Sequence, residues 1–280
     1  MWLFYALITV ALTTILGTTM RLSAIKAKDP RSYAFAYNIL GLTILGILLC
    51  IQRDFKIELN WYLAGLLFVS GLGYGLFHRL QFLVRKHVES SELATITTAA
   101  TVIGYLLAIF WLGEPFKIVR FIGYVLIILA ALAVLQKQRK FVINKYAFLG
   151  LMIGSAIAVS GVIDRRTAPQ FSSVLLYVGF IWLAQTIVVF VPKISLQSVR
   201  AEFKLHGVWL PALVCLNLLQ TFTVISAVRL APATQVQPIL ASNVIFIALA
   251  GILFLHERER KWLKLAAALL ATIGLLLVSS

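Results

Sequence analysis

Long apolar stretches separated by short polar segments run along the whole chain. Charged residues or proline bound each of them. The stretches fall at 2–20, 33–52, 61–80, 91–112, 118–135, 146–163, 172–191, 207–226, 233–255 and 262–278. A helix that crosses the hydrocarbon core of a bilayer needs about 20 residues. Because lipid offers no hydrogen-bond partners to the backbone, these stretches must be helical. The pattern predicts an all-α polytopic membrane protein with ten transmembrane helices.

Composition supports this class and excludes others. Hydrophobic residues make up 61% of the 280 residues and charged residues 12%. Soluble domains carry roughly 45–50% apolar and about 25% charged residues, and disordered chains are less hydrophobic still. The net charge of +15 lies mainly between the apolar stretches, where lipid headgroups and membrane orientation explain it better than nucleic acid does. We therefore expect a lipid bilayer and a small-molecule substrate as partners, and no nucleic acid.

The two halves of the chain resemble each other. A basic tract at 136–140 divides the ten stretches into five and five, and Trp111-Leu112-Gly113-Glu114 matches Leu253-Phe254-Leu255-His256-Glu257 at an offset of 143 residues. Because each half has an odd number of spans, two similar halves must have opposite orientations in the membrane. We therefore predict two inverted five-helix repeats, 1–138 and 139–280, an arrangement typical of secondary transporters with a central site.

Sequence motifs in both halves resemble a known family. The segment 227–234 (Ala-Val-Arg-Leu-Ala-Pro-Ala-Thr), followed by Pro238 and by 256–259 (His-Glu-Arg-Glu), is similar to the second repeat of EamA-type transporters of the drug/metabolite transporter superfamily. Gly113-Glu114 and Gly123 are similar to the first repeat. The resemblance implies a transporter fold, with cargoes that range over amino acids, metabolites, sugars and toxic cations. The chain departs from many relatives at Tyr37-Asn38, where they have an arginine.

The basic residues predict an orientation. Of the 25 lysines and arginines, 18 lie in the odd-numbered loops between stretches. The positive-inside rule places those loops in the cytoplasm and both termini outside. The family resemblance implies the opposite, with both termini inside. We favour the charge count, because the rule works best for short loops such as these.

Polar residues within the apolar stretches suggest a solute-binding site. Asn217, Gln220 and Thr221 have the i, i+3, i+4 spacing of one helical face. Shifted by 143, that face becomes Tyr74, Phe77 and His78, so both repeats offer polar groups at equivalent depth. The alternative role for these groups is hydrogen bonding between helices, which contributes about 0.6 kcal/mol per pair.

Three further amides complete the set of candidates. Gln235 and Asn243 in the ninth stretch need partners outside their own helix, and Asn38 lies early in the second stretch. Thr95, Thr98 and Thr101 are instead expected to bond to their own helix. The predicted substrate-binding residues are Tyr74, His78, Asn217, Gln220, Thr221, Gln235, Asn243 and Asn38. No catalytic residue, metal site or cofactor is predicted.

These features together predict a secondary transporter. It would move a small organic solute, an amino acid or other neutral or zwitterionic metabolite, across the cell membrane by alternating access, with export from a bacterial cell through its inner membrane as the expected case. Proton-coupled export of lipophilic cations fits less well, because the first stretch has no carboxylate and Glu89, Glu92 and Asp164 lie near stretch ends. Spans one, three, four, six, eight and nine are expected around the cavity, with five and ten peripheral and available for a homodimer. The alternative is a membrane-embedded enzyme acting on a lipid or small hydrophobic substrate.

Overall fold

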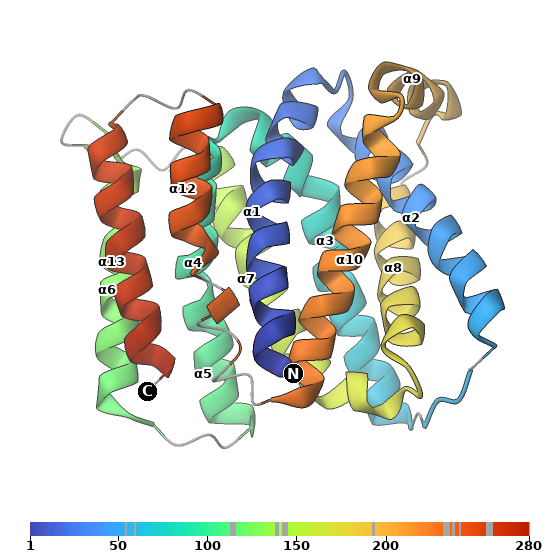
Figure 1. The fold of residues 1–280 in the computed structure, drawn as a ribbon, viewed down its shortest axis with the longest axis horizontal. Helices are drawn as coiled ribbons and strands as arrows, with labels where there is room; N and C mark the ends of the chain where they lie inside the picture. Colours follow the sequence, from blue (N-terminus) through green and yellow to red (C-terminus); the bar gives the residue numbers. More distant parts are fainter. Residues whose placement is uncertain are drawn as a thin grey trace.

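The chain folds into a bundle of helices (Figure 1). The computed structural model describes residues 1–53, 55–58, 60–112, 116–137, 140–141, 145–191, 194–231, 236, 239–240, 242–255 and 260–279. The helices before the midpoint are α1 (Trp2–Lys26), α2 (Pro30–Gln52), α3 (Trp61–His87), α4 (Ser90–Ala99), α5 (Thr101–Leu112) and α6 (Ile118–Leu135). Those after it are α7 (Lys145–Thr167), the 3-10 helix η1 (Ala168–Gln170), α8 (Val174–Phe190), α9 (Leu196–His206), α10 (Trp209–Leu230), α12 (Asn243–Phe254) and α13 (Lys261–Ser279). Between α6 and α7, the two-residue strands β1 (Gln136–Lys137) and β2 (Lys140–Phe141) pair antiparallel.

The helices confirm an all-α, multi-pass membrane protein. Within the described residues, seven are long and apolar enough to cross a membrane, and α4 and α5 together form one of these candidate spans, Ser90–Trp111. Three shorter apolar helices, Ile118–Ala133, Val174–Phe190 and Asn243–Phe254, lie in the other three apolar stretches. Twelve residues of α helix rise only about 18 Å, less than the hydrocarbon core. The number of ten spans therefore stays a prediction.

Side chains at the helix starts explain where several helices begin. Asp29 caps α2 by accepting from the backbone N–H of Arg31 at 3.1 Å, and Pro30 occupies the first helical position. Asn60 caps α3 and Ser173 caps α8 in the same way, at 2.9 and 3.1 Å. Such caps satisfy backbone donors that the first turn of a helix leaves free.

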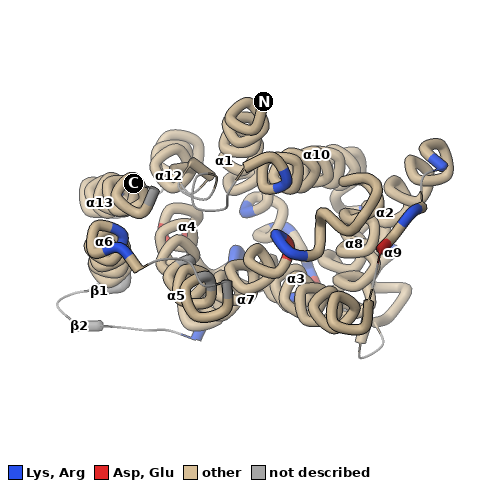
Figure 2. Tube along the Cα trace, turned by 90° about the horizontal axis from the view of Figure 1, so that it is seen from below, with Lys and Arg blue, Asp and Glu red and all other residues tan. Residues whose placement is uncertain are grey.

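The bundle is elongated, with a pair of helices towards each end and a central group of helices between them. Viewed along the bundle, α6 and α13 lie at one end and α2 and α8 towards the other, with α1, α3, α4, α7, α10 and α12 between them (Figure 2). Both chain termini lie on one face of the bundle, and α9 lies on the opposite face (Figure 1). Large apolar side chains on the outside, such as Phe68, Ile187 and Leu276, are more than half exposed. Such outer faces fit a lipid environment.

Two glycines bring α6 and α13 into close contact. A Cβ atom added at Gly123 would overlap the backbone carbonyl of Gly274, and one added at Gly274 would lie 2.5 Å from the carbonyl of Gly123. Small residues at such a crossing let two membrane helices approach backbone to backbone.

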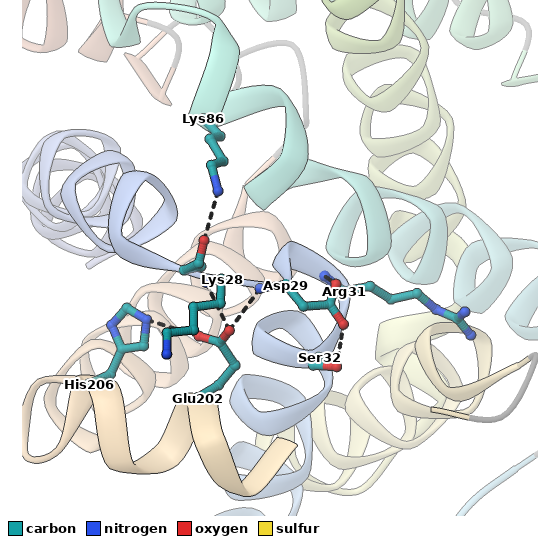
Figure 3. A network of polar contacts seen from close by, with 8 residues as sticks. Lys28, Asp29, Arg31, Ser32, Lys86, Glu202 and His206 are labelled. Atoms are coloured by element: carbon teal, nitrogen blue, oxygen red, sulfur yellow. Dashed lines mark hydrogen bonds and ion pairs between the residues drawn. The ribbon is translucent and has the colours of Figure 1, made fainter. Parts of the chain in front are cut away.

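The amphipathic helix α9, which the sequence analysis did not predict, is fixed to the turn between α1 and α2 (Figure 3). The carboxylate of Glu202 accepts hydrogen bonds from the backbone N–H groups of Lys28 and Asp29, at 2.9 and 2.8 Å. On the other side of the turn, Lys86 Nζ on α3 donates to the carbonyl of Ala27 at 2.8 Å. His206 Nε2 lies 3.3 Å from Glu202 Oε2. The turn is therefore bound by one helix from each half of the chain.

Candidate functional site

A cavity of about 340 Å³ lies in the middle of the bundle. Side chains from α1, α3, α4, α7, α8, α10 and α12 line it. Its polar lining residues are Thr13, Tyr74, His78, Gln81, Arg85, Ser90, Thr97, Thr98, Asp164, Gln185, Asn217, Gln220, Thr221 and Asn243. Pockets that bind small molecules combine apolar walls with a few such polar groups.

Six of the eight predicted site residues line this cavity. They are Tyr74, His78, Asn217, Gln220, Thr221 and Asn243. Asn38 does not: its side chain is fully buried in α2, where Nδ2 donates to the carbonyl of Ala34 at 2.7 Å. Gln235 lies outside the described residues. That any of the eight binds a solute stays a prediction.

On α10, the predicted polar face is connected to α1. Gln220 Nε2 donates to Thr13 Oγ1 at 3.2 Å, and Asn217 Nδ2 lies 3.4 Å from Gln220 Oε1. Thr221 bonds back to the carbonyl of Asn217 at 2.8 Å. The buried Oδ1 of Asn217 has no partner among the described residues. This face therefore joins two helices and still leaves one acceptor free in the cavity.

On α3, His78 begins a polar stripe. His78 Nδ1 and Gln81 Nε2 are 3.1 Å apart, and because the amide nitrogen can only donate, Nδ1 accepts and Nε2 carries the ring proton. The ring of His78 lies against Tyr37 and Trp182, with centroids 6.2 and 5.8 Å away. Arg85 lies seven residues after His78, two turns along the same face.

Arg85 was not predicted as a site residue. Arg85 follows the third apolar stretch and was counted with the loop after it, but α3 continues to His87, so Arg85 lies inside a helix and lines the cavity. Its Nη1 donates to the carbonyl of Gly17 on α1 at 3.2 Å. Ser90 Oγ donates to the same carbonyl at 3.1 Å. The signal that could have found Arg85 is its spacing from His78.

Asp164 is held by hydroxyl groups from two other helices. Ser70 and Tyr177 donate to Oδ1 at 3.0 and 2.7 Å, and Tyr74 donates to Oδ2. The carboxylate comes from α7, Ser70 and Tyr74 from α3, and Tyr177 from α8. Asp164 lies near the end of its apolar stretch, as noted from the sequence, but these partners were not predicted. The cluster joins both halves of the chain at one end of the cavity.

The cavity is also lined by α8, which was not expected around it. Ile181, Trp182 and Gln185 line it, and their i, i+1 and i+4 spacing puts them on one side of α8. Gln185 is an amide within an apolar stretch, a signal that the sequence analysis passed over. Thr95 and Thr98 bond back to Ser91 and Ala94 at 3.0 and 2.8 Å, as predicted.

The first half of the chain matches a known protein family. Residues 1–136 match the model of the EamA-like transporter family. The first half of the chain is therefore similar to that family. The match confirms for the first half of the chain the resemblance to EamA-type transporters noted in the sequence. The search of curated proteins finds no match.

A solved structure supports the same fold over the whole chain. Among the similar structures is one described only as "Crystal structure of protein", with a TM-score of 0.61 and 16% sequence identity. The match covers 98% of this chain and 96% of the other. At this identity the likeness concerns the fold alone.

Proposed function

We propose that the protein is a secondary transporter that moves a small organic solute across the cell membrane by alternating access. The observation that carries the proposal is the central cavity, where polar side chains from seven helices converge inside an otherwise apolar bundle. Polar groups at membrane depth are expensive and are usually retained for function. The EamA-like match of residues 1–136 makes transport the activity to test first.

The helix contacts support two inverted repeats, 1–138 and 139–280. In a repeat of this kind α1 corresponds to α7, α3 to α10 and α4 to α12. The helix α1 contacts α10 and α12, and its counterpart α7 contacts α3 and α4, the counterparts of those two helices. The helices α2 and α8 correspond to each other and are in contact, and so are α6 and α13. This is the relation expected for halves around a two-fold axis in the membrane plane, with the site between them.

The six lining residues named above would hold the solute by hydrogen bonds and perform no chemistry. Asn217 and His78 are the sharpest variants, because they lie on equivalent helices of the two repeats. In proteoliposomes loaded with a labelled solute, Asn217→Ala and His78→Ala should each slow counterflow at least tenfold, about 1.4 kcal/mol of lost interaction. Asn38→Ala, which changes a buried amide outside the cavity, is the matched control. Undiminished counterflow in both cavity variants would exclude this site.

The solute itself is best found in cells. Untargeted metabolomics of cells that lack and cells that overproduce the protein should reveal a solute whose level changes reciprocally. Export predicts that it accumulates inside when the protein is absent. Recovery of the solute chemically unchanged after passage through proteoliposomes distinguishes transport from the alternative, a membrane-embedded enzyme, which would convert it.

For orientation we propose that both termini face outside a bacterial inner membrane. The face opposite the termini carries α9 and the turn before α2, within loops rich in lysine and arginine (Figure 1). If Arg85 is left out of the loop count, lysines and arginines still lie mostly in the odd-numbered loops. Reporter fusions at both termini test this, and a cytoplasmic signal from both would overturn it. A homodimer formed through the peripheral pair α6 and α13 is the arrangement we would look for by crosslinking.

A further inference from the structure

Arg85 places a positive charge close to mid-depth in the bundle. Its Nη1 reaches the carbonyl of Gly17, three residues from the midpoint of α1 (Trp2–Lys26), or about 4–5 Å along the helix axis. Arginines near the ends of membrane helices normally extend their head groups outward to the interface. Arg85 instead extends inward across the cavity to another helix. A charged side chain at this depth is costly, and such residues usually mark a functional site.

Within the part of the chain that the structure describes, the charge of Arg85 has no counter-ion. Among the described residues, no carboxylate lies within ion-pair distance of it, and its buried Nε has no hydrogen-bond partner. Among these residues the hydrogen bond of Arg85 uses Nη1, so Nη2 is free as well. The carbonyl oxygen of Gly17 is neutral, and Arg85 shares it with Ser90, which also donates a hydrogen bond to it.

Among the described lining residues the other charged group, Asp164, is too far from Arg85 and already has hydrogen-bond partners. Asp164 binds Ser70 and Tyr74 on α3, and Arg85 follows Tyr74 by 11 residues on that helix, about 16 Å of rise. Three hydroxyl groups already donate to Asp164. The two charges therefore belong to different ends of the cavity, and the end at Arg85 is left positive.

The free donors of Arg85 define the group that would neutralise it. Nε–H and one N–H of Nη2 lie on the same edge of the planar guanidinium and point in parallel. That spacing matches the two oxygens of a carboxylate. The volume of about 340 Å³ limits the rest of the molecule to a small solute.

We propose that Arg85 binds the carboxylate of the transported solute, so that the cavity takes small carboxylates, either organic acids or amino acids. This inference rests on the proposed transport function and narrows its cargo to molecules with a carboxylate. Gln81, one turn before Arg85 and also lining the cavity, supplies an amide beside the bound group.

The first test compares acids with their amides on the wild-type protein. Purified protein in detergent is melted with each of the twenty amino acids and with two- to six-carbon mono- and dicarboxylates, each paired with its primary amide. We expect at least one acid to raise the melting temperature while its amide does not. Equal stabilisation by acid and amide, stabilisation by inorganic phosphate or phosphate monoesters instead of carboxylates, or no stabilisation by any acid would overturn the assignment.

The second test uses variants of α3. Arg85→Gln should weaken binding of the stabilising acid at least tenfold, in line with the loss of a charge-assisted hydrogen bond, and Arg85→Lys should retain part of it. Arg79→Gln removes the same charge from the same helix outside the cavity, where Arg79 bonds to the carbonyl of Val191, and should bind like wild type. Unchanged binding by Arg85→Gln would refute the proposal. Should Arg85→Gln fail to fold, the comparison of acids and amides on the wild type still decides.

The failures of the two proposals can be told apart. Proteoliposomes in which Arg85→Gln carries the solute as fast as wild type would refute the role of Arg85 and leave transport standing. Acid-specific binding that depends on Arg85, with no counterflow of the bound acid, would refute transport and leave the carboxylate site standing.

Discussion

Glu202 on α9 accepts a hydrogen bond from the backbone N–H of Asp29, 2.8 Å away, at the start of α2. Because Asp29 is the N-cap of α2, this carboxylate lies at the positive end of that helix. The contact joins residues 173 positions apart in sequence. It fixes an amphipathic helix to the only turn that separates α1 from α2.

Neutralising Glu202 should loosen this contact. Glu202 is 1% exposed, so Glu202→Gln replaces a buried charged acceptor by a neutral one. We expect a loss of about 1–2 kcal/mol in stability, measured by thermal unfolding in detergent. Glu58→Gln changes an exposed glutamate and is the control. A melting temperature equal to that of the control would mean that the carboxylate charge contributes nothing here.

The attachment of α9 should weaken at acidic pH. Burial lowers the pKa of His206 below its usual value of 6.5, with Lys26 acting in the same direction and Glu202 opposing it. The detached helix would therefore bind a proton that the attached one does not, so attachment is at full strength above about pH 6.5 and is lost as the pH falls below it. Hydrogen exchange of residues 196–206 between pH 5 and 8 measures this.

A variant isolates the histidine in that experiment. His206 lies against the ring of Tyr33, with centroids 4.3 Å apart, and His206→Phe keeps an aromatic ring there without a titratable group. In this variant the extra hydrogen exchange of residues 196–206 at acidic pH should disappear. Tighter attachment of the wild type at acidic pH would show instead that an ion pair with Glu202 outweighs burial.

Adding one methyl group at the crossing of α6 and α13 should separate these helices. Gly123→Ala would place Cβ against the carbonyl of Gly274, which is backbone and cannot move aside alone. We expect a clear fall in melting temperature, of the size of overpacking in a core, about 1–3 kcal/mol. Gly46→Ala has nothing within 4 Å of the new Cβ and should be neutral or stabilising. Equal behaviour of the two variants would contradict the close contact.

Removing the acceptor at the end of the cavity should also destabilise the fold. Asp164→Ala leaves the hydroxyls of Ser70, Tyr74 and Tyr177 without their acceptor, at a cost on the order of 1–3 kcal/mol. Tyr177→Phe removes one donor and should cost less. The exposed Tyr62 provides a control in Tyr62→Phe. Thermal unfolding ranks the variants, and the reverse order would show that Asp164 is not the centre of the cluster.

Sequence reasoning located the helices and much of the cavity because both depend on local patterns. Apolar length predicts a membrane helix, and the spacing of Asn217, Gln220 and Thr221 predicts a polar face. Arg85 was missed because hydropathy ends a span at the first charged residues, whereas α3 continues past them to His87. The helical face that α8 turns to the cavity and the partners of Asp164 depend on how distant helices pack. No pattern within one stretch contains that information.

The exchange of contacts between the halves has a consequence for synthesis. The helix α1 packs against α10 and α12, and α7 packs against α3, α4 and α5, so each half covers its apolar faces with helices of the other. While the ribosome is still making residues after 138, the first five helices lack the surfaces they will finally contact. We therefore expect the halves to be unstable when made alone and to recover when produced together as two separate chains, because the packing of their helices, and not the peptide link, holds them together.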